Sequence, residues 1–211
     1  MLTDRTRLRR KADRGSHDRA VIEAILDEAL ICHVGFAVDG RPSVIPMIHA
    51  RVDDRLYLHG AAGNHLLRAL ADGIEVCVTV TLLDGLVLAR SAFHHSMNYR
   101  SVVIFGAAER VDDADEKLRA VEAVVEHVVP GRCGDTRPPT PEELRATLVV
   151  RIPISEASAK IRTGPPIEEP ADLDLDHWAG ELPLRLTPGT PVPDGDVRAP
   201  VPDHVQAWAR P

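Results

Sequence analysis

The chain has 211 residues, of which 44% are hydrophobic and 3% aromatic, and its formal net charge at neutral pH is -7. This length and apolar content suffice for one large domain with a buried core. The negative charge argues against general nucleic-acid binding, and the few aromatic side chains argue against base stacking. No apolar run approaches the roughly 20 residues that a membrane-spanning helix needs, so no membrane partner is expected.

The N-terminus is basic, and no apolar segment of a signal peptide follows it, so a cytoplasmic protein is expected. Residues 1–16 are predicted to form a flexible arm. Its cluster of positive charges could meet an anion, but a solvated terminus is the favoured interpretation. Cys32, Cys77 and Cys133 are widely spaced and include no CxxC pair. This pattern is typical of reduced thiols and not of a disulfide scaffold or a zinc site.

Apolar residues at helical spacing predict a helix that opens at Ser16 or His17 and continues to Ala29. Residues 31–38 predict a strand, Asp39-Gly40 a two-residue hairpin turn, and residues 42–51 the partner strand. The prolines within the partner strand indicate that it lies at a sheet edge or bends near Pro46.

Five further apolar runs are predicted as strands: one ending at His59, then residues 76–82, 86–91, 99–111 and 148–154. Three more helices are predicted at residues 64–72, at residues 113–129, and after the capping box at Thr140. Asp84-Gly85 predicts a turn between two of the strands. Six or seven strands with frequent turns favour a small antiparallel barrel, mainly β with flanking helices (α+β).

Beyond Thr163 the chain becomes rich in proline and acidic residues. Trp178, Leu182, Leu184 and Trp208 are nevertheless too apolar for a free tail. We therefore expect residues 164–211 to wrap over a barrel domain formed by residues 17–163, with these side chains docked on it.

Two segments carry the residues of a candidate ligand site. In residues 57–68, Gly60 and Gly63 permit a tight turn after a strand, and Asn64 is a good N-cap for the next helix. Such a turn presents unpaired backbone N–H groups to an anion. Residues 89–106 crowd polar groups between two β-rich runs, and few structural needs explain so many there: His94, His95, Ser96, Asn98, Tyr99, Arg100 and Ser101.

The chain resembles the pyridoxamine 5′-phosphate oxidase-like flavoproteins, especially the branch that includes nitroimidazole-resistance proteins. The resemblance covers roughly residues 15–165 and rests on Arg41-Pro-Ser-Val-Ile-Pro-Met47, Tyr57-Leu-His-Gly-Ala61 and Asn98-Tyr-Arg-Ser-Val-Val-Ile-Phe-Gly106. It implies an FMN-binding split β-barrel of antiparallel Greek-key type. It also implies a homodimer with the FMN at the subunit interface and an oxidoreductase of the flavin reductase or oxidase type. The substrate would be a small molecule.

The resemblance also implies the residues that contact the flavin. They are Val44, Ile45, Pro46, Met47, His59, Gly60, Ala61, Gly63, Asn64, His65, Arg100 and Ser101. Arg68 and Tyr99 join these candidates because of their own positions in the two segments. Family members often grip the flavin phosphate with a Ser-Arg or Arg-Lys pair where this chain has Asn64-His65. Arg68 or Arg100 could replace that pair, because arginine stays charged and binds phosphate bidentately. No residue stands out as an obligatory acid or base.

Alternative interpretations concern the same residues. The glycines could serve only the turn. The competing class is a binding protein without turnover, a split barrel that holds haem, another flavin-like cofactor or no cofactor. Haem is considered because neutral imidazole is a common axial ligand and several histidines surround the site: His59, His65, His94 and His95. Zinc is disfavoured, because adjacent residues on a strand, such as His94 and His95, face opposite ways.

Overall fold

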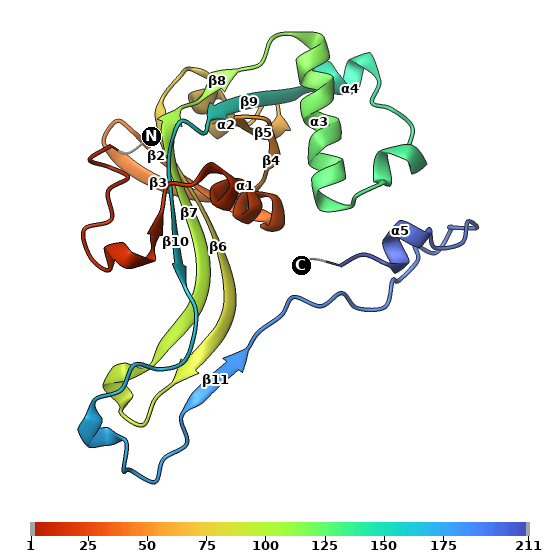
Figure 1. Cartoon of the computed structure of the whole chain (residues 1–211). Helices are drawn as coiled ribbons and strands as arrows, with labels where there is room; N and C mark the ends of the chain where they lie inside the picture. The colour runs from red at the N-terminus through yellow and green to blue at the C-terminus, as the bar shows by residue number, and fades with distance from the viewer. Residues whose placement is uncertain (1–2, 210–211) are drawn as a thin grey trace.

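Two antiparallel sheets build the protein, and the computed structural model describes residues 3–209 of the chain (Figure 1). The strands are β1 (Gly15–Ser16), β2 (Ile31–Val38), β3 (Arg41–Ile48), β4 (Ala50–Val52), β5 (Arg55–Ala61), β6 (Glu75–Leu88), β7 (Ser96–Ala107), β8 (Glu109–Arg110), β9 (Thr147–Pro153), β10 (Glu156–Arg162) and β11 (Gly180–Pro183). The larger sheet has the order β1-β10-β7-β6-β2-β3, with β11 also paired to β6. The smaller sheet has the order β4-β5-β9-β8.

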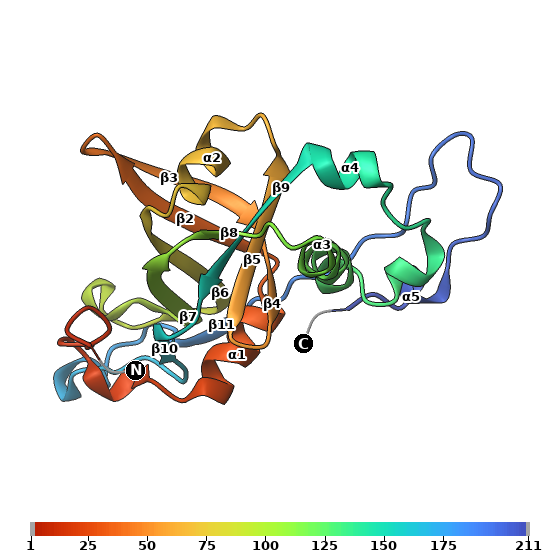
Figure 2. The ribbon, with the colours of Figure 1, turned by 90° about the horizontal axis from the view of Figure 1, so that it is seen from above.

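The described residues also form five helices: α1 (Arg19–Glu28), α2 (His65–Ala71), α3 (Ala114–Val128), α4 (Pro141–Ala146) and α5 (Asp203–Gln206). Short 3-10 turns are η1 (Ala12–Arg14), η2 (Ala92–His94), η3 (Arg132–Asp135) and η4 (Pro170–Asp172). Seen from above, the strands enclose a barrel and α3 lies outside it (Figure 2). The predicted split barrel, mainly β with flanking helices, is confirmed. No helix in the described part of the chain is long and apolar enough to cross a membrane.

Aliphatic side chains from both sheets fill the barrel. β2 alternates between buried and outward-facing residues, as a half-buried strand should. Leu26 of α1 and Leu67 of α2 are fully buried with side chains of β5, β6 and β7. Each such side chain contributes roughly 1.5–3 kcal/mol to folding, so both helices are fixed on the barrel by their apolar faces.

The hairpin of β2 and β3 forms as predicted. Asp39 and Gly40 have φ values of 51° and 73°, which are typical of the primed hairpin turns. β3 lies at the end of the larger sheet, so the predicted edge position is also confirmed. The strand breaks at His49 and not at Pro46, because the His49 side chain turns inward and its Nε2 donates to the carbonyl of Leu26 at 3.0 Å.

The predicted turn at Asp84-Gly85 is wrong. β6 continues through both residues with a shift in its pairing to β7, and it is the longest strand at 14 residues. The chain reverses later, around η2. Gly85 instead permits close approach of β11, because a Cβ atom there would lie 3.0 Å from the carbonyl oxygen of Leu182.

β10 was not predicted as a strand. Its sequence, Glu-Ala-Ser-Ala-Lys-Ile-Arg, contains few β-branched residues and therefore has a weak strand signal. Ala157 and Ala159 are nevertheless buried against the barrel core. Pairing with β7 on one side and β1 on the other determines the strand.

The N-terminal arm is anchored, in contrast to the flexible arm that was predicted. Arg5 pairs with Glu156 at 2.5 Å and with Glu75 at 3.1 Å, and Thr6 is buried. Gly15 and Ser16 add a short strand to β10. β10, the strand that was not predicted, thus provides the sheet edge that binds the N-terminal arm. The arm's first two residues lie outside the described residues.

Residues 164–209, here called the C-terminal strap, dock through both backbone pairing and side-chain hydrogen bonds. β11 pairs with β6, and the indole Nε1 of Trp208 donates to the carbonyl of Val128 at 2.8 Å. The expected burial of Trp178, Leu182 and Leu184 is wrong, because they are 68%, 50% and 37% exposed. The strap therefore presents apolar side chains outward along the long antiparallel pair of β6 and β7, here called the β6–β7 ribbon.

We expect Gly85→Val to detach β11 from β6. A branched side chain would meet Leu182 and Pro183 backbone atoms at 3.0–3.4 Å, and such overpacking costs about 1–3 kcal/mol. Limited proteolysis should then cut the strap faster than in the unmodified protein. Gly195→Val is the control, since nothing lies within 4 Å of its Cβ position. Equal cleavage rates in both variants would contradict this role of Gly85.

Candidate functional site

The β5–α2 turn, residues 61–64, is held in a defined conformation by backbone bonds. Ala62 N–H donates to the carbonyl of Ala146 at 2.8 Å, and Asn64 N–H donates to that of Ala61 at 2.8 Å. The Asn64 side chain accepts from the backbone N–H of Leu67 at 3.3 Å, so it caps α2 as predicted. The turn is therefore a fixed platform at the mouth of the barrel.

Two exposed polar side chains follow on α2. The Nε of Arg68 donates to the carbonyl of Ala62 at 2.8 Å, which holds the cation beside the turn. This bond engages one of the five N–H groups of the guanidinium. His65 is exposed at the first position of the helix, and Gly63 borders open space, with no atom within 4 Å of its Cβ position. A permanent cation and an imidazole thus stand next to one turn.

His59 and Gly60 have different roles at the end of β5. A Cβ atom on Gly60 would lie 2.4 Å from Leu67 Cδ1, so this glycine lets α2 pack closely on the strand. The half-buried His59 has a buried Nδ1 with no hydrogen-bond partner among residues 3–209. Burial lowers the pKa of its imidazole, which favours the neutral form. A ligand could satisfy that nitrogen.

The predicted segment Val44–Met47 lies on β3, whose outer edge pairs with no other strand in the described chain. Ile45 and Met47 pack against the core, whereas Val44 is 66% exposed. Val44, Pro46 and Ile48 are alternate residues of β3 and therefore share its outward face. Ile31 of β2, which pairs in register with Ile48, lies on the same face. The strand therefore offers open backbone groups beside an exposed apolar face.

The structure does not bring Arg100 to the β5–α2 turn. Arg100 lies opposite Leu82, near the middle of β6, whereas α2 directly precedes the start of that strand. Its guanidinium donates to Asp84 and Glu28, and Nη2 lies 2.8 Å from the Asp84 oxygen and 2.7 Å from the Glu28 oxygen. These bonds hold the pKa of Arg100 above its usual range. Within one chain Arg100 therefore does not lie beside the turn, and its contact with a flavin phosphate stays a prediction.

The neighbours of Arg100 on β7 are also apart from the turn. The Ser101 hydroxyl donates to the carbonyl of Lys160 at 3.2 Å, and Tyr99 pairs in register with Arg162 of β10. Tyr99, Arg100 and Ser101 therefore form a group of their own, on the ribbon and away from the predicted phosphate contacts.

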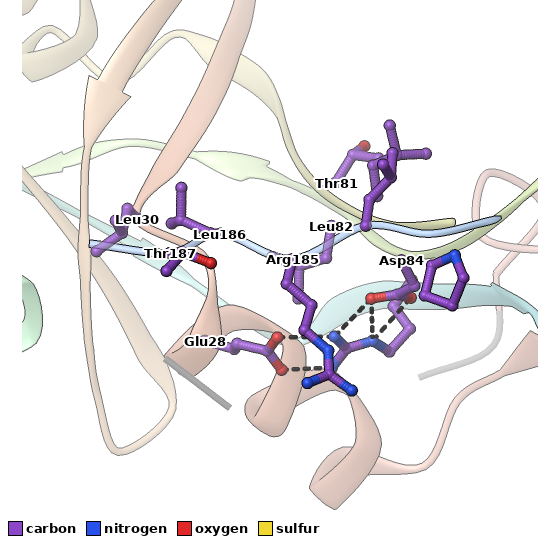
Figure 3. Close-up of a pocket in the computed structure, with 12 residues that line it drawn as sticks. Glu28, Leu30, Thr81, Leu82, Asp84, Arg185, Leu186 and Thr187 are labelled. Carbon is purple, nitrogen blue, oxygen red and sulfur yellow. Dashed lines mark hydrogen bonds and ion pairs between the residues drawn. The ribbon is translucent and has the colours of Figure 1, made fainter. Parts of the chain in front are cut away.

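A cavity of about 620 Å³ lies beside Arg100 and was not predicted. Figure 3 shows the carboxylates of Glu28 and Asp84 converging on one guanidinium, with Arg185 to Thr187 of the strap passing along the cavity. Leu184 N–H donates to the Asp84 carbonyl at 3.0 Å, which fixes the strap there. The sequence offered no signal for this cavity, because its walls come from α1, β6, β7 and the strap.

The remaining candidate histidines lie at the far end of the β6–β7 ribbon from α2 (Figure 1). His94 Nε2 is 3.8 Å from a Glu169 oxygen, and His95 Nδ1 donates to the carbonyl of Ser91 at 3.1 Å. Within residues 3–209 no group of three or more metal-ligating side chains comes together. Only His59 and His65 of the four are near the turn.

The barrel of two antiparallel sheets, with a helix start and an open edge strand at its mouth, defines a split-barrel protein. A family model described as pyridoxamine 5′-phosphate oxidase matches residues 18–161. The chain belongs to this family, and the predicted resemblance is confirmed. A search of curated proteins found no match.

Solved structures extend the comparison over the whole chain. The flavocytochrome Anf3 from Azotobacter vinelandii is 36% identical, with a TM-score of 0.92 over 99% of this chain and 98% of that one. The FAD and haem binding protein from Mycobacterium smegmatis is also 36% identical, with a TM-score of 0.89 over 93% and 98%. A proposed 5-nitroimidazole antibiotic resistance protein from Bacteroides thetaiotaomicron is 26% identical, with a TM-score of 0.57 over 70% and 86%.

Proposed function

We propose that this protein is a cytoplasmic, homodimeric oxidoreductase that binds both a flavin and a haem and reacts with a small-molecule substrate. The supporting observation is the similarity to a flavocytochrome over 99% of the chain, which includes the strap outside the family model. The similarity to the nitroimidazole-resistance protein covers 70%. The proposal thus combines the flavin that was expected with the haem of the alternative interpretation.

The residues at the mouth of the barrel fit a flavin. A bound flavin supplies electron or hydride transfer at its ring. The open backbone edge at Ile45–Met47 can orient that ring, the orphaned Nδ1 of neutral His59 can bond it, and Arg68 can bind a phosphate. The sequence predicts FMN, whereas the mycobacterial relative binds FAD. We favour FAD, because that relative matches 93% of the chain.

His65 is our candidate for the axial haem ligand. An axial ligand needs an accessible imidazole on a fixed backbone, and His65 is exposed at the first position of α2. It also stands where family members often carry a basic phosphate-binding residue. His94 and His95 contact groups at the ribbon end, and His59 is half-buried. Two side chains next to the turn thus have different proposed roles: Arg68 binds a flavin phosphate and His65 binds the haem iron.

The homodimer is proposed from the outward face of β3. Ile31, Val44 and Ile48 are 53%, 66% and 45% exposed on this face, next to an unpaired strand edge. Proteins normally cover such edges and apolar patches. A second copy related by a two-fold axis would cover the same face on both subunits and enclose the flavin site between them.

The absorption spectrum of the purified protein tests the proposal. We expect flavin bands together with a Soret band. Mass spectrometry of the acid-released flavin distinguishes FAD from FMN, and light scattering gives the oligomeric state. A protein that shows neither band after incubation with FAD, FMN and haem would contradict the proposed function.

We expect Arg68→Ala to weaken flavin binding by about tenfold to a hundredfold, because a charge-assisted hydrogen bond contributes about 1.5–3 kcal/mol. The dissociation constant is measured by fluorescence titration of the flavin-free protein. Riboflavin, which lacks phosphate, should be affected much less. Arg119→Ala removes another exposed charge, from α3, and serves as the control. Equal losses for FMN, FAD and riboflavin would assign Arg68 a structural role.

A further inference from the structure

A second polar cavity is lined by the N-terminal arm and the end of β10. The backbone of the arm runs beside the sheet here (Figure 1). The volume of the cavity is about 370 Å³. Arg14 of η1 and Arg162 of β10 line it, together with Thr163 and the exposed carboxylate of Asp13. None of these residues belongs to the β5–α2 turn or to the cavity at Arg100. We call it the basic pocket.

Arg162 is a buried cation with neutral hydrogen-bond partners. Its side chain is buried, and the residue is 5% exposed. The guanidinium donates to the Asn98 side-chain oxygen and to the carbonyls of Gly164 and Pro165, the latter two at 2.5 Å and 2.8 Å. The carboxylate of Glu181 accepts from the Asn98 amide at 2.5 Å instead of contacting Arg162. Buried charges are usually paired with an opposite charge, and these bonds do not supply one.

A second cation makes this arrangement more unusual. Burial lowers the pKa of Arg162 and repulsion from Arg14 lowers it further, whereas the charge of Glu181 opposes this shift only in part. The two positive groups are held near each other because β1 and the Arg5–Glu156 pair fix the arm on β10. The hydrogen bonds from Arg162 to carbonyl groups are explained if Arg162 anchors the turn of residues 163–165. This anchoring does not explain why Arg14 lines the same cavity.

We propose that the basic pocket binds an oxyanion, a phosphate group, between the guanidinium groups of Arg14 and Arg162. Three of the five N–H groups of Arg162 already donate to Asn98, Gly164 and Pro165, so two remain for a phosphate oxygen. Arg14 can add its own N–H groups, and the two positive charges exceed the single carboxylate of Asp13. Thr163 adds a hydroxyl at the rim. The phosphate could be free or part of a dinucleotide electron donor. The proposal depends on these residues alone and not on the flavin or haem assignment.

Titration calorimetry of the purified full-length protein with inorganic phosphate tests the pocket, with chloride used to keep the ionic strength constant. We expect Arg14→Ala to weaken phosphate binding by about tenfold or more, as loss of a charge-assisted bond does. Arg10→Ala is the matched control, because Arg10 is exposed on the same arm and lies outside the pocket. It should change the affinity less than twofold.

Two further variants keep the result unambiguous. Arg68→Ala should retain phosphate binding, which separates the basic pocket from the proposed flavin-phosphate contact. Arg162→Lys keeps the buried charge but loses the fork, so it should also weaken binding, and circular dichroism checks that it is folded. Equal affinities in the unmodified protein and Arg14→Ala, or equal losses in Arg10→Ala and Arg14→Ala, would overturn the proposal.

The source of the phosphate follows from a comparison of NADPH and NADH, which differ by one phosphate group. Tighter, Arg14-dependent binding of NADPH would identify the dinucleotide as the ligand. Arg14-dependent binding of inorganic phosphate without this preference would identify free phosphate. Absence of Arg14-dependent binding for all three probes would overturn the site.

Discussion

His65→Ala is expected to abolish the Soret band of the haem-loaded protein while leaving the flavin bands in place. Removal of an axial imidazole leaves the iron without its bond to the protein, whereas the flavin contacts at β3, His59 and Arg68 remain. The measurement is the haem-to-flavin absorbance ratio after incubation with both cofactors. Arg68→Ala should change this ratio in the opposite direction, because it removes a phosphate contact.

Two controls distinguish loss of the haem ligand from unfolding of the protein. His177→Ala removes an exposed imidazole from the strap and should retain the Soret band. Added imidazole should restore haem binding in His65→Ala, because the small molecule can occupy the vacated position. Retention of the full Soret band in His65→Ala, or its loss in His59→Ala alone, would assign the ligand to another residue.

The double variant Val44→Glu/Ile48→Glu is expected to be monomeric. Each of these apolar side chains, once covered by a partner, contributes up to about 1.5–3 kcal/mol. Replacement by glutamate removes that contribution, and a two-fold axis would place the new charges of both subunits in one interface. Self-association should weaken by at least about a hundredfold, as measured by sedimentation at several concentrations.

The flavin provides a second readout for the same variant. Because the proposed site lies on β3 between the subunits, the monomer should also lose flavin affinity. Val192→Glu is the control, since Val192 is highly exposed on the strap and lies away from β3. A monomeric unmodified protein, or a variant that remains dimeric, would contradict the interface.

The class of fold and the mouth of the barrel were predictable because neighbouring residues in the sequence determine them. Asp39-Gly40 sets the β2–β3 hairpin through its two positive φ angles. Asn64 caps α2, and the Thr140 side chain forms the predicted capping box with Glu143. The prolines of β3 predicted its edge position. In each case the interaction spans only a few residues, so the local pattern contains the necessary information.

Interactions between distant segments decided the rest. Arg100 looked like a phosphate ligand in the sequence, but Glu28, 72 residues away, binds its guanidinium in the folded chain. Gly85 looked like a turn residue, yet it accommodates β11 from the strap. The basic arm looked solvated, and pairing with β10 anchors it beside Arg162. The sequence by itself determined the split barrel, its edge strand and the β5–α2 turn. The tertiary structure decided which charged side chains are neutralised by a partner and which face a cavity, because that depends on charges brought together by folding from far apart in the chain.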